Sequence, residues 1–187
     1  MACLAKLQTS RVSNPCKREA GYGNVVYFLN RADVTGGSFN SISQDLETVT
    51  LAATKLAYKW EGVEFGYEKV ATQVANSNNW DLQLTLRFDY NGSLDLNAIM
   101  ALAKAKDLIA VIPTNESGYY EVIGINNSLT DQTYLSGLHR ETTNLPSGRN
   151  SGDETDATLV FKGISNNPGL FFKAASGTNK AYFDALL

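Results

Sequence analysis

The chain has 187 residues, 43% of them hydrophobic, which is enough for one buried core, so we expect a single domain. Its formal net charge of -3 disfavours tight binding of nucleic acid, because a phosphate backbone attracts basic surfaces. We find neither an apolar run of membrane-spanning length nor a secretory signal, so we expect a chain that does not span a membrane and is not exported by a signal peptide.

The composition of residues 1–24 predicts an N-terminal arm. Four basic side chains stand against one acidic side chain here, and Pro15 and two glycines interrupt the segment. Such a terminus is either solvated or ordered by a neighbouring, more acidic subunit. Cys3 and Cys16 have no histidine or further cysteine at zinc-ligand spacing, so we expect plain thiols, with a disulfide between them as the alternative.

Between residues 25 and 70 the pattern predicts strands separated by short turns. Val25–Asn30 is an apolar run of strand length, and Gly36-Gly37-Ser38 has the composition of a turn. Three further strands are expected at 47–51, 56–60 and 63–70. Because only a short turn separates the last two, they predict a hairpin from Tyr58 to Tyr67 that extends past the sheet.

The clearest pattern lies in residues 80–127, where it predicts strand, helix, strand, turn and strand. Apolar and polar side chains alternate up to Asp89, as in a sheet with one buried and one wet face. A helical period follows from Asp95 to Lys106. Its apolar face is expected to comprise Leu96, Ile99, Met100 and Ala103. Strands are expected again at 108–112 and 119–125.

The remainder of the chain predicts a long polar loop, two strands and a tail. Residues 128–156 have little periodicity and are rich in Ser, Thr, Gly and Asn, so we expect a loop that is mobile or ordered by a partner. Strands are expected at 157–162 and 170–172. The single domain is therefore placed at residues 25–172, and a C-terminal tail at 173–187.

No group of residues predicts catalysis or a cofactor. His139 is the only histidine, and neither Ser136 nor Ser147 has the sequence context of an activated nucleophile. The acidic cluster at 153–156 lacks the spacing of a calcium loop. We therefore expect no enzyme, no cofactor and no metal, and favour a structural protein that assembles through sheet edges, loops and arms.

A binding module is the alternative from another class. It would be a β domain that stacks a small molecule or carbohydrate on Trp60, Tyr119 and Tyr120. A hydrolase is a more distant alternative, since catalytic residues need no contiguous motif.

A series of short segments, taken in order, carries a resemblance over residues 16–172. The segments are Cys16, Val25–Asp33, Thr48–Leu51, Ala57–Glu61, Leu96–Lys106, Leu108–Ile112, Gly118–Gly124 and Asp156–Gly163. In this order they resemble bacteriophage tail tube proteins, most closely the tail-tube-like virion proteins of phages of Bacteroidetes hosts. Asn126-Asn127-Ser128 departs from the family's pattern, in which a glycine follows the Gly-x-Asn of the late hairpin.

The resemblance implies a mainly β (α+β) fold, an antiparallel β-sandwich or half-barrel flanked by one short α-helix. It implies a non-enzymatic virion protein, assembled in the bacterial host cytoplasm. Its copies would close into rings, commonly hexamers, that stack around a channel through which genomic DNA passes without specific binding. Other tail or neck proteins would be its partners. A neck, ring or tail-hub protein with the same fold is the alternative.

The predicted hairpin and arm would supply the contacts between subunits. The expected contact residues are Tyr58, Trp60, Phe65 and Tyr67 in the hairpin, and Leu4, Leu7 and Arg11 in the arm. The acidic balance of the chain suits a lumen that does not retain DNA.

Overall fold

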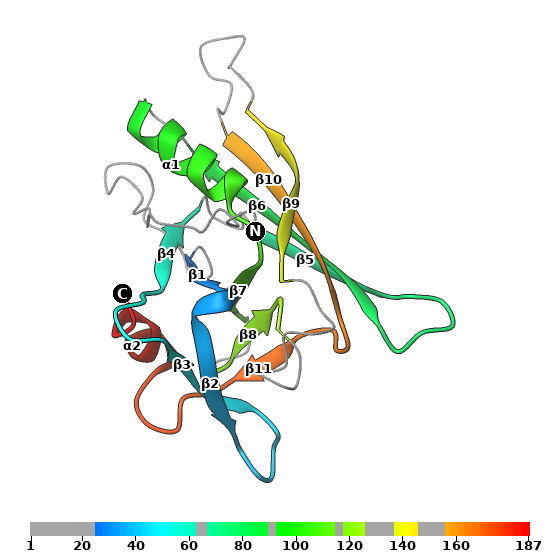
Figure 1. The fold of residues 1–187 in the computed structure, drawn as a ribbon, viewed down its shortest axis with the longest axis vertical. Coiled ribbons are helices and arrows are strands. Elements are labelled where there is room, and N and C mark those ends of the chain that lie inside the picture. Colours follow the sequence, from blue (N-terminus) through cyan, green and yellow to red (C-terminus); the bar gives the residue numbers. More distant parts are fainter. Residues whose placement is uncertain (1–24, 63–66, 90–92, 115–117, 126–136, 146–155) are drawn as a thin grey trace.

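The structure, a computed structural model, describes residues 25–62, 67–89, 93–114, 118–125, 137–145 and 156–187. These residues form two β-sheets with α-helices against them (Figure 1), so the prediction of a mainly β fold with one main short helix is confirmed. The elements in chain order are β1 (Val25–Asn30), the 3-10 helix η1 (Arg31–Asp33), β2 (Val34–Phe39), β3 (Leu46–Leu51), β4 (Tyr58–Glu61), β5 (Tyr67–Gln73), β6 (Trp80–Asp89), α1 (Ser93–Lys104), β7 (Leu108–Pro113), β8 (Tyr120–Ile123), β9 (His139–Asn144), β10 (Asp156–Ser165), β11 (Leu170–Phe172) and α2 (Asn179–Asp184).

The large sheet has seven strands in the order β2-β3-β11-β8-β7-β1-β4, and the small sheet has four in the order β5-β6-β10-β9. Among these strands only the pairing of β11 with β3 is parallel. Buried side chains from both sheets share one hydrophobic cluster, which includes Phe28, Trp60, Leu84 and Phe161. The two sheets therefore form the layers of a sandwich over a common core.

The central strands of the large sheet are covered on both faces. On β7, Ala110 faces the cluster between the sheets, whereas its neighbours Ile109 and Val111 belong to a second cluster on the other face. That second cluster also contains Phe172 of β11 and Phe183 of α2. Because side chains alternate across a strand, a strand covered on both faces needs an unbroken apolar run, which is the pattern at 108–112.

The small sheet is covered on one face only. Leu82, Leu84, Leu86 and Phe88 of β6 are buried, while the residues between them are exposed or half-buried. The same alternation runs along β10. For β6 the period of two in the sequence predicted both the strand and its buried face correctly, and for β10 the sequence predicted the strand.

The predicted hairpin from Tyr58 to Tyr67 is wrong. β4 pairs with β1 in the large sheet, whereas β5 pairs with β6 in the small sheet, so the chain passes between the sheets after Glu61. The physical reason is Trp60, whose side chain is fully buried and packs on Phe88 with ring centroids 5.3 Å apart. The hairpin that projects from the body is β5–β6 (Figure 1).

The predicted apolar face of the helix needs a correction. Ile99 and Ala103 are buried as expected, and Leu102 is buried with them. Leu96 and Met100, however, are 36% and 38% exposed. The helix is therefore rotated relative to the prediction, and it presents two apolar side chains one turn apart on its outer surface.

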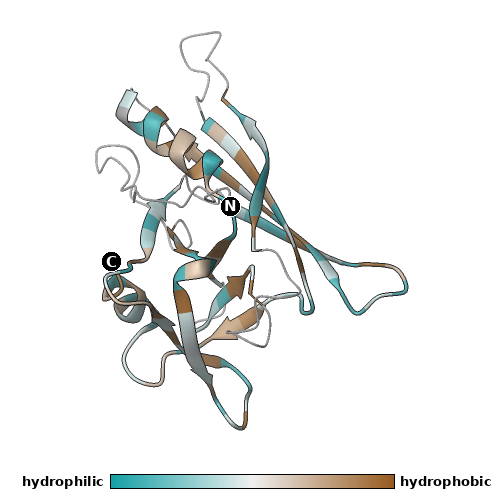
Figure 2. Ribbon diagram, viewed as in Figure 1, coloured by the Kyte–Doolittle hydropathy of each residue, from teal (hydrophilic) through white to brown (hydrophobic). Residues whose placement is uncertain are grey.

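Part of the predicted polar loop is a strand. Within residues 128–156, His139–Asn144 forms β9 and pairs with β10. Side chains of β9 are almost all exposed, and Figure 2 shows a largely hydrophilic strand. Backbone pairing with β10 holds such a strand in place, so the hydropathy of its side chains gives no signal.

A smaller correction concerns Gly36-Gly37-Ser38, which lies inside β2 and does not form a turn. The register of β2 against β3 shifts between Val34 and Gly36 and again between Ser38 and Phe39. Glycine is frequent at such irregular positions of edge strands, where it resembles a turn signal in the sequence.

The segment predicted as a tail is packed onto the domain. α2 begins after Thr178, whose side-chain oxygen accepts a hydrogen bond from the Ala181 N–H at 3.2 Å. Phe183 is fully buried in the second cluster. The Tyr182 hydroxyl accepts from the Val49 N–H at 2.7 Å and donates to the Val49 carbonyl at 3.0 Å. The C-terminal residues thus complete the core of the large sheet.

Candidate functional site

The small sheet offers two edges for assembly. In the described part of the chain, β5 pairs only with β6, and β9 pairs only with β10. Each edge therefore presents backbone N–H and C=O groups that can bind a further strand. These two edges are the candidate functional site.

The directions of the strands make the two edges complementary. All pairings in the small sheet are antiparallel, so directions alternate across its four strands and β5 runs opposite to β9. If copies are related by rotation about a common axis, β5 of one copy meets β9 of the next with the strands antiparallel. The alternation then continues across the junction without interruption.

Contacts to the large sheet hold the β5 edge in place. Lys69 of β5 forms an ion pair with Glu121 of β8, and both side chains are mostly buried. The Tyr67 hydroxyl donates a hydrogen bond to the carbonyl oxygen of Pro113 in β7. Burial, and after it the nearby Glu121 carboxylate, raises the pKa of the Tyr67 hydroxyl. Tyr67 therefore stays protonated as a donor, and β5 is fixed at both contacts.

The β9 edge carries polar and charged side chains. His139, Arg140 and Glu141 are exposed, and Glu141 forms an ion pair with Lys162 of β10 at 2.6 Å. Charged side chains on an edge strand disfavour indiscriminate pairing with other proteins. A partner strand on this edge has to accommodate those charges.

The outer face of the small sheet mixes polar side chains with the exposed apolar side chains of Val70 and Ile164. Gln83 and Thr85 of β6 lie opposite Lys162 and Val160 of β10. Arg87 forms an ion pair with Asp156 at 3.1 Å. In the described residues this face therefore lacks the dense basic charge of a nucleic-acid binding site.

The predicted contact residues are only partly at the surface. Trp60 is fully buried, which corrects the expectation that it contacts another subunit. Tyr58 and Tyr67 are half-buried and pack against the cluster between the sheets. The other predicted contact residues, Phe65, Leu4, Leu7 and Arg11, lie outside the described residues.

The structure does not bring the predicted stacking residues together. Trp60 packs in the cluster between the sheets, whereas Tyr120 packs against the second cluster and stacks on Phe183 with centroids 6.0 Å apart. Tyr119 lies next to the exposed Phe171, with centroids 6.1 Å apart. Trp60, Tyr119 and Tyr120 therefore do not form one stacking surface for a sugar ring.

The residues considered for chemistry are not assembled into a site. His139 is exposed on β9, and Asp156 is engaged with Arg87. Ser136, Ser147 and the rest of the acidic cluster lie outside the described residues. Within the described ranges there is no group of three or more His, Cys, Asp or Glu side chains that could hold a metal ion.

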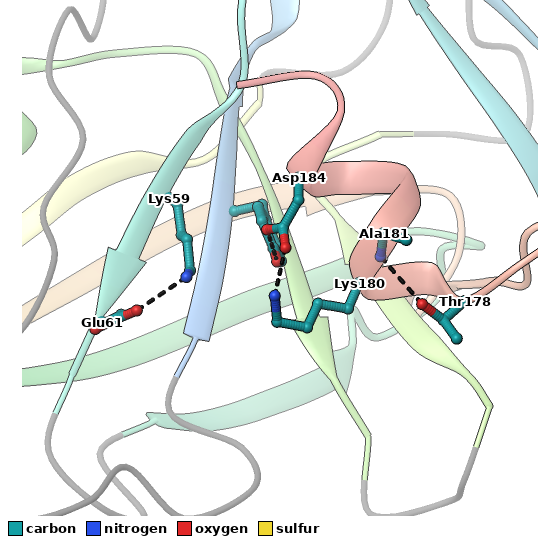
Figure 3. Close-up of polar contacts among 7 residues, drawn as sticks. Lys59, Glu61, Thr178, Lys180, Ala181 and Asp184 are labelled. Atoms are coloured by element: carbon teal, nitrogen blue, oxygen red, sulfur yellow. Dashed lines mark hydrogen bonds and ion pairs between the residues drawn. The ribbon is translucent and has the colours of Figure 1, made fainter.

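A partly buried polar cluster attaches α2 to the large sheet (Figure 3). The Tyr27 hydroxyl donates to the Asp184 carboxylate at 2.8 Å, and Lys180 forms an ion pair with the same carboxylate. The pair of Lys59 and Glu61 on β4 lies nearby, with 2.9 Å between charged atoms. Burial raises the pKa of the Asp184 carboxyl, but hydrogen bonds from Lys180 and Tyr27 outweigh it and hold that pKa below its ordinary value of 3.8.

This cluster predicts an acid-dependent loss of stability. Because the pKa of Asp184 is lower in the folded chain, its carboxylate contributes stability above the unfolded pKa, and that stability is lost as the pH falls through the folded pKa. Urea unfolding of the wild type and of Asp184→Asn between about pH 3 and pH 7 measures this contribution. The variant is expected to lose stability less steeply in acid. Equal slopes for both proteins would contradict the assignment.

No helix in the part of the chain that the structure describes is long and apolar enough to cross a membrane. Comparisons with protein-family models, curated proteins and solved structures found no match to this chain.

Proposed function

We propose that the chain is a non-enzymatic virion protein, a bacteriophage tail tube subunit whose copies form stacked rings around a DNA channel. The observation that carries the proposal is the small sheet, whose two open edges run in opposite directions. In this proposal β5 of each subunit pairs with β9 of the next, and the small sheets join into one closed barrel. Closure removes every open edge of that sheet.

The properties of the small sheet support its place on the inside of such a ring. Two basic side chains of its outer face, Arg87 and Lys162, form ion pairs with Asp156 and Glu141. Facing the lumen, that surface lets DNA pass without strong attraction, as expected for a chain of net charge -3. The order of sequence segments shared with tail tube proteins supports the same function, and it implies a location in the virion with other tail or neck proteins as partners.

A neck, ring or tail-hub protein is the second candidate. Such a protein would use the same closed ring in a single layer, so edge pairing supports it equally. The number of stacked rings separates the candidates. Negative-stain images of the purified protein are expected to show tubes of indefinite length for a tube subunit and isolated rings for a neck or hub protein. A stable monomer in light scattering would contradict both candidate functions.

Edge pairing can be tested with two adjacent prolines in β5. In an antiparallel strand, successive residues direct their N–H and C=O groups to opposite sides. One of Val70→Pro and Ala71→Pro therefore removes an N–H that binds β6, and the other removes an N–H at the open edge. The first variant should be destabilised. The second should keep a free energy of unfolding within about 1 kcal/mol of the wild type and lose ring formation.

Each of the two variants serves as the control for the other, because both introduce a proline into β5 at adjacent positions. Circular dichroism and urea unfolding identify the variant that keeps its fold, and electron microscopy scores rings. If the well-folded variant still forms rings as the wild type does, the β5 edge is not the subunit interface and the proposal is wrong.

A further inference from the structure

An exposed aromatic strip lies on the large sheet beside the β5 edge. Phe171 of β11 is 49% exposed, and its ring lies edge-on to that of Tyr119, with centroids 6.1 Å apart. The ammonium group of Lys173 lies 5.3 Å from the centroid of the Tyr119 ring. These three residues are the aromatic strip. Aromatic side chains that stay exposed side by side are typical of surfaces that a partner covers.

The strip lies on the face of the large sheet that is turned towards the small sheet. Phe171 pairs with Glu121 of β8, so their side chains point to the same face. Lys69 of β5 forms its ion pair with Glu121 from the small sheet, which identifies that face as the one between the two layers. Gly169 lies two positions before Phe171, and a Cβ on it would be 2.9 Å from the Lys69 ammonium. The Lys69 side chain therefore covers Gly169 and Glu121, whereas Phe171 is exposed beyond it.

A strand added to the β5 edge would lie over the aromatic strip. In the small sheet β6 packs on β4, where Phe88 contacts Trp60. Its neighbour β5 packs on β8, where Lys69 pairs with Glu121. A step from β6 to β5 in the small sheet is thus a step from β4 towards β11 in the large sheet. The next strand in this direction, about 4.8 Å beyond β5, comes to lie above β11 and Phe171.

β9 carries one free side chain on the matching face. Arg140 pairs with Phe161 of β10, whose side chain is buried between the sheets, so Arg140 points towards the same layer. Arg140 is exposed, and within the described residues it has no ion-pair partner. Thr143 points the same way, but its hydroxyl is already buried in its own subunit. Because a guanidinium is weakly hydrated and stacks on aromatic faces, Arg140 is suited to cover Phe171.

The charges around Phe171 are compatible with a stacked guanidinium. Glu121, its neighbour on β8, is paired with Lys69, and that pair has no net charge. Lys173 is exposed, so water and salt weaken its repulsion of a second cation. A guanidinium that is shielded from water on the Phe171 ring gains more than this repulsion costs. A lysine in place of Phe171, by contrast, would offer Arg140 only a like charge.

We propose that Arg140 on β9 of one copy packs on Phe171 of the next copy in the ring. This inference rests on the proposed pairing of β9 with β5, and it adds a contact in the second layer of the same junction. Within one copy the two residues cannot meet, because β6 and β10 separate β9 from β5. The contact therefore forms only between copies, and it accounts for the exposure of Phe171 in the single chain.

A charge exchange tests the contact. Phe171→Lys is expected to raise the protein concentration at which half of the chains are in rings at least about tenfold. Adding Arg140→Glu to Phe171→Lys is expected to restore ring formation through an ion pair across the junction. Ile164→Lys is the matched control, because Ile164 is 46% exposed but lies on the central strand β10, and it should assemble as the wild type does. Light scattering measures assembly, and circular dichroism checks each fold.

The result does not depend on the folding of one variant. Arg140→Glu alone changes an exposed residue of an edge strand and should also weaken ring formation at least about tenfold. Wild-type assembly of folded Phe171→Lys or of Arg140→Glu would overturn the contact and leave the edge pairing standing. Failure of the double variant to recover ring formation would also overturn the contact. Absence of rings in the wild type would overturn both proposals.

Thiol labelling shows whether the strip is covered. In a background with Cys3→Ser and Cys16→Ser, Lys173→Cys is expected to react with a maleimide at least about tenfold more slowly in rings than in dissociated chains. Ile164→Cys should react equally fast in both states, since the outer face of β10 stays open to small reagents. Equal rates for Lys173→Cys in rings and in single chains would overturn the covering of the strip, while the rings themselves would still support the edge pairing.

Discussion

Phe183→Ala is expected to lower the free energy of unfolding by about 3–5 kcal/mol, the usual cost of truncating a fully buried phenylalanine. Phe183 lies on the C-terminal helix and has no exposed surface. Its ring lies 4.7 Å from that of Phe172 and 5.3 Å from that of Tyr27, measured between centroids. Removing it opens a cavity where α2 meets the large sheet. Urea unfolding, followed by circular dichroism, measures the change.

Leu187→Ala is the matched control for this variant. Leu187 is 42% exposed and belongs to the same segment. Its truncation is expected to change stability by less than about 1 kcal/mol. A small effect of Phe183→Ala would mean that residues 173–187 are an appendage, as the sequence alone predicted, and that their packing does not stabilise the domain.

Gly124→Ala is expected to destabilise the protein by about 2–5 kcal/mol, the sum of a backbone penalty and a steric one. Gly124 has a φ of +88°, in the left-handed region. A Cβ at this position would lie 2.6 Å from the carbonyl oxygen of Leu108 and 3.2 Å from the Leu138 side chain. The Leu108 carbonyl also accepts a hydrogen bond from the Leu138 N–H at 2.7 Å, so it has little freedom to move.

Gly118→Ala separates the two contributions. Gly118 has a similar φ of +91°, but a Cβ there would meet nothing within 4 Å. The Gly118→Ala variant should therefore lose only the backbone contribution, about 1–2 kcal/mol of the free energy of unfolding. Unfolding curves of the two variants, measured side by side, give the steric contribution by difference. Equal losses in both variants would show that the Leu108 carbonyl yields to the added methyl group.

The strands that sequence could predict are those whose side chains alternate or stay apolar throughout. β6 and β10 have one buried face, and β7 is covered on both, so each leaves its own hydropathy pattern. β9 leaves none, because its pairing with β10 buries backbone groups and few side chains. Hydropathy reports burial of side chains, and an edge strand has little of it.

The candidate site could be predicted only in part from the sequence, for a related reason. Sequence reasoning expected a projecting hairpin but placed it one strand too early, because neighbouring strands usually pair with each other. The choice of partner strand depends on where Trp60 packs, and Trp60 faces the core between the two sheets. No local pattern distinguishes a tryptophan that anchors a strand to one sheet from one that contacts another subunit.

In the described residues the small sheet has four strands, an even number. Under the proposed edge pairing, this number limits how the sheet can gain or lose strands. Adding a hairpin contributes two strands, so the outermost strands still run in opposite directions and copies still join antiparallel. Adding or losing a single strand would make the outermost strands run the same way and force parallel pairing at every junction. If copies pair through these edges as proposed, a chain that forms the same ring is therefore expected to widen or narrow the sheet by whole hairpins.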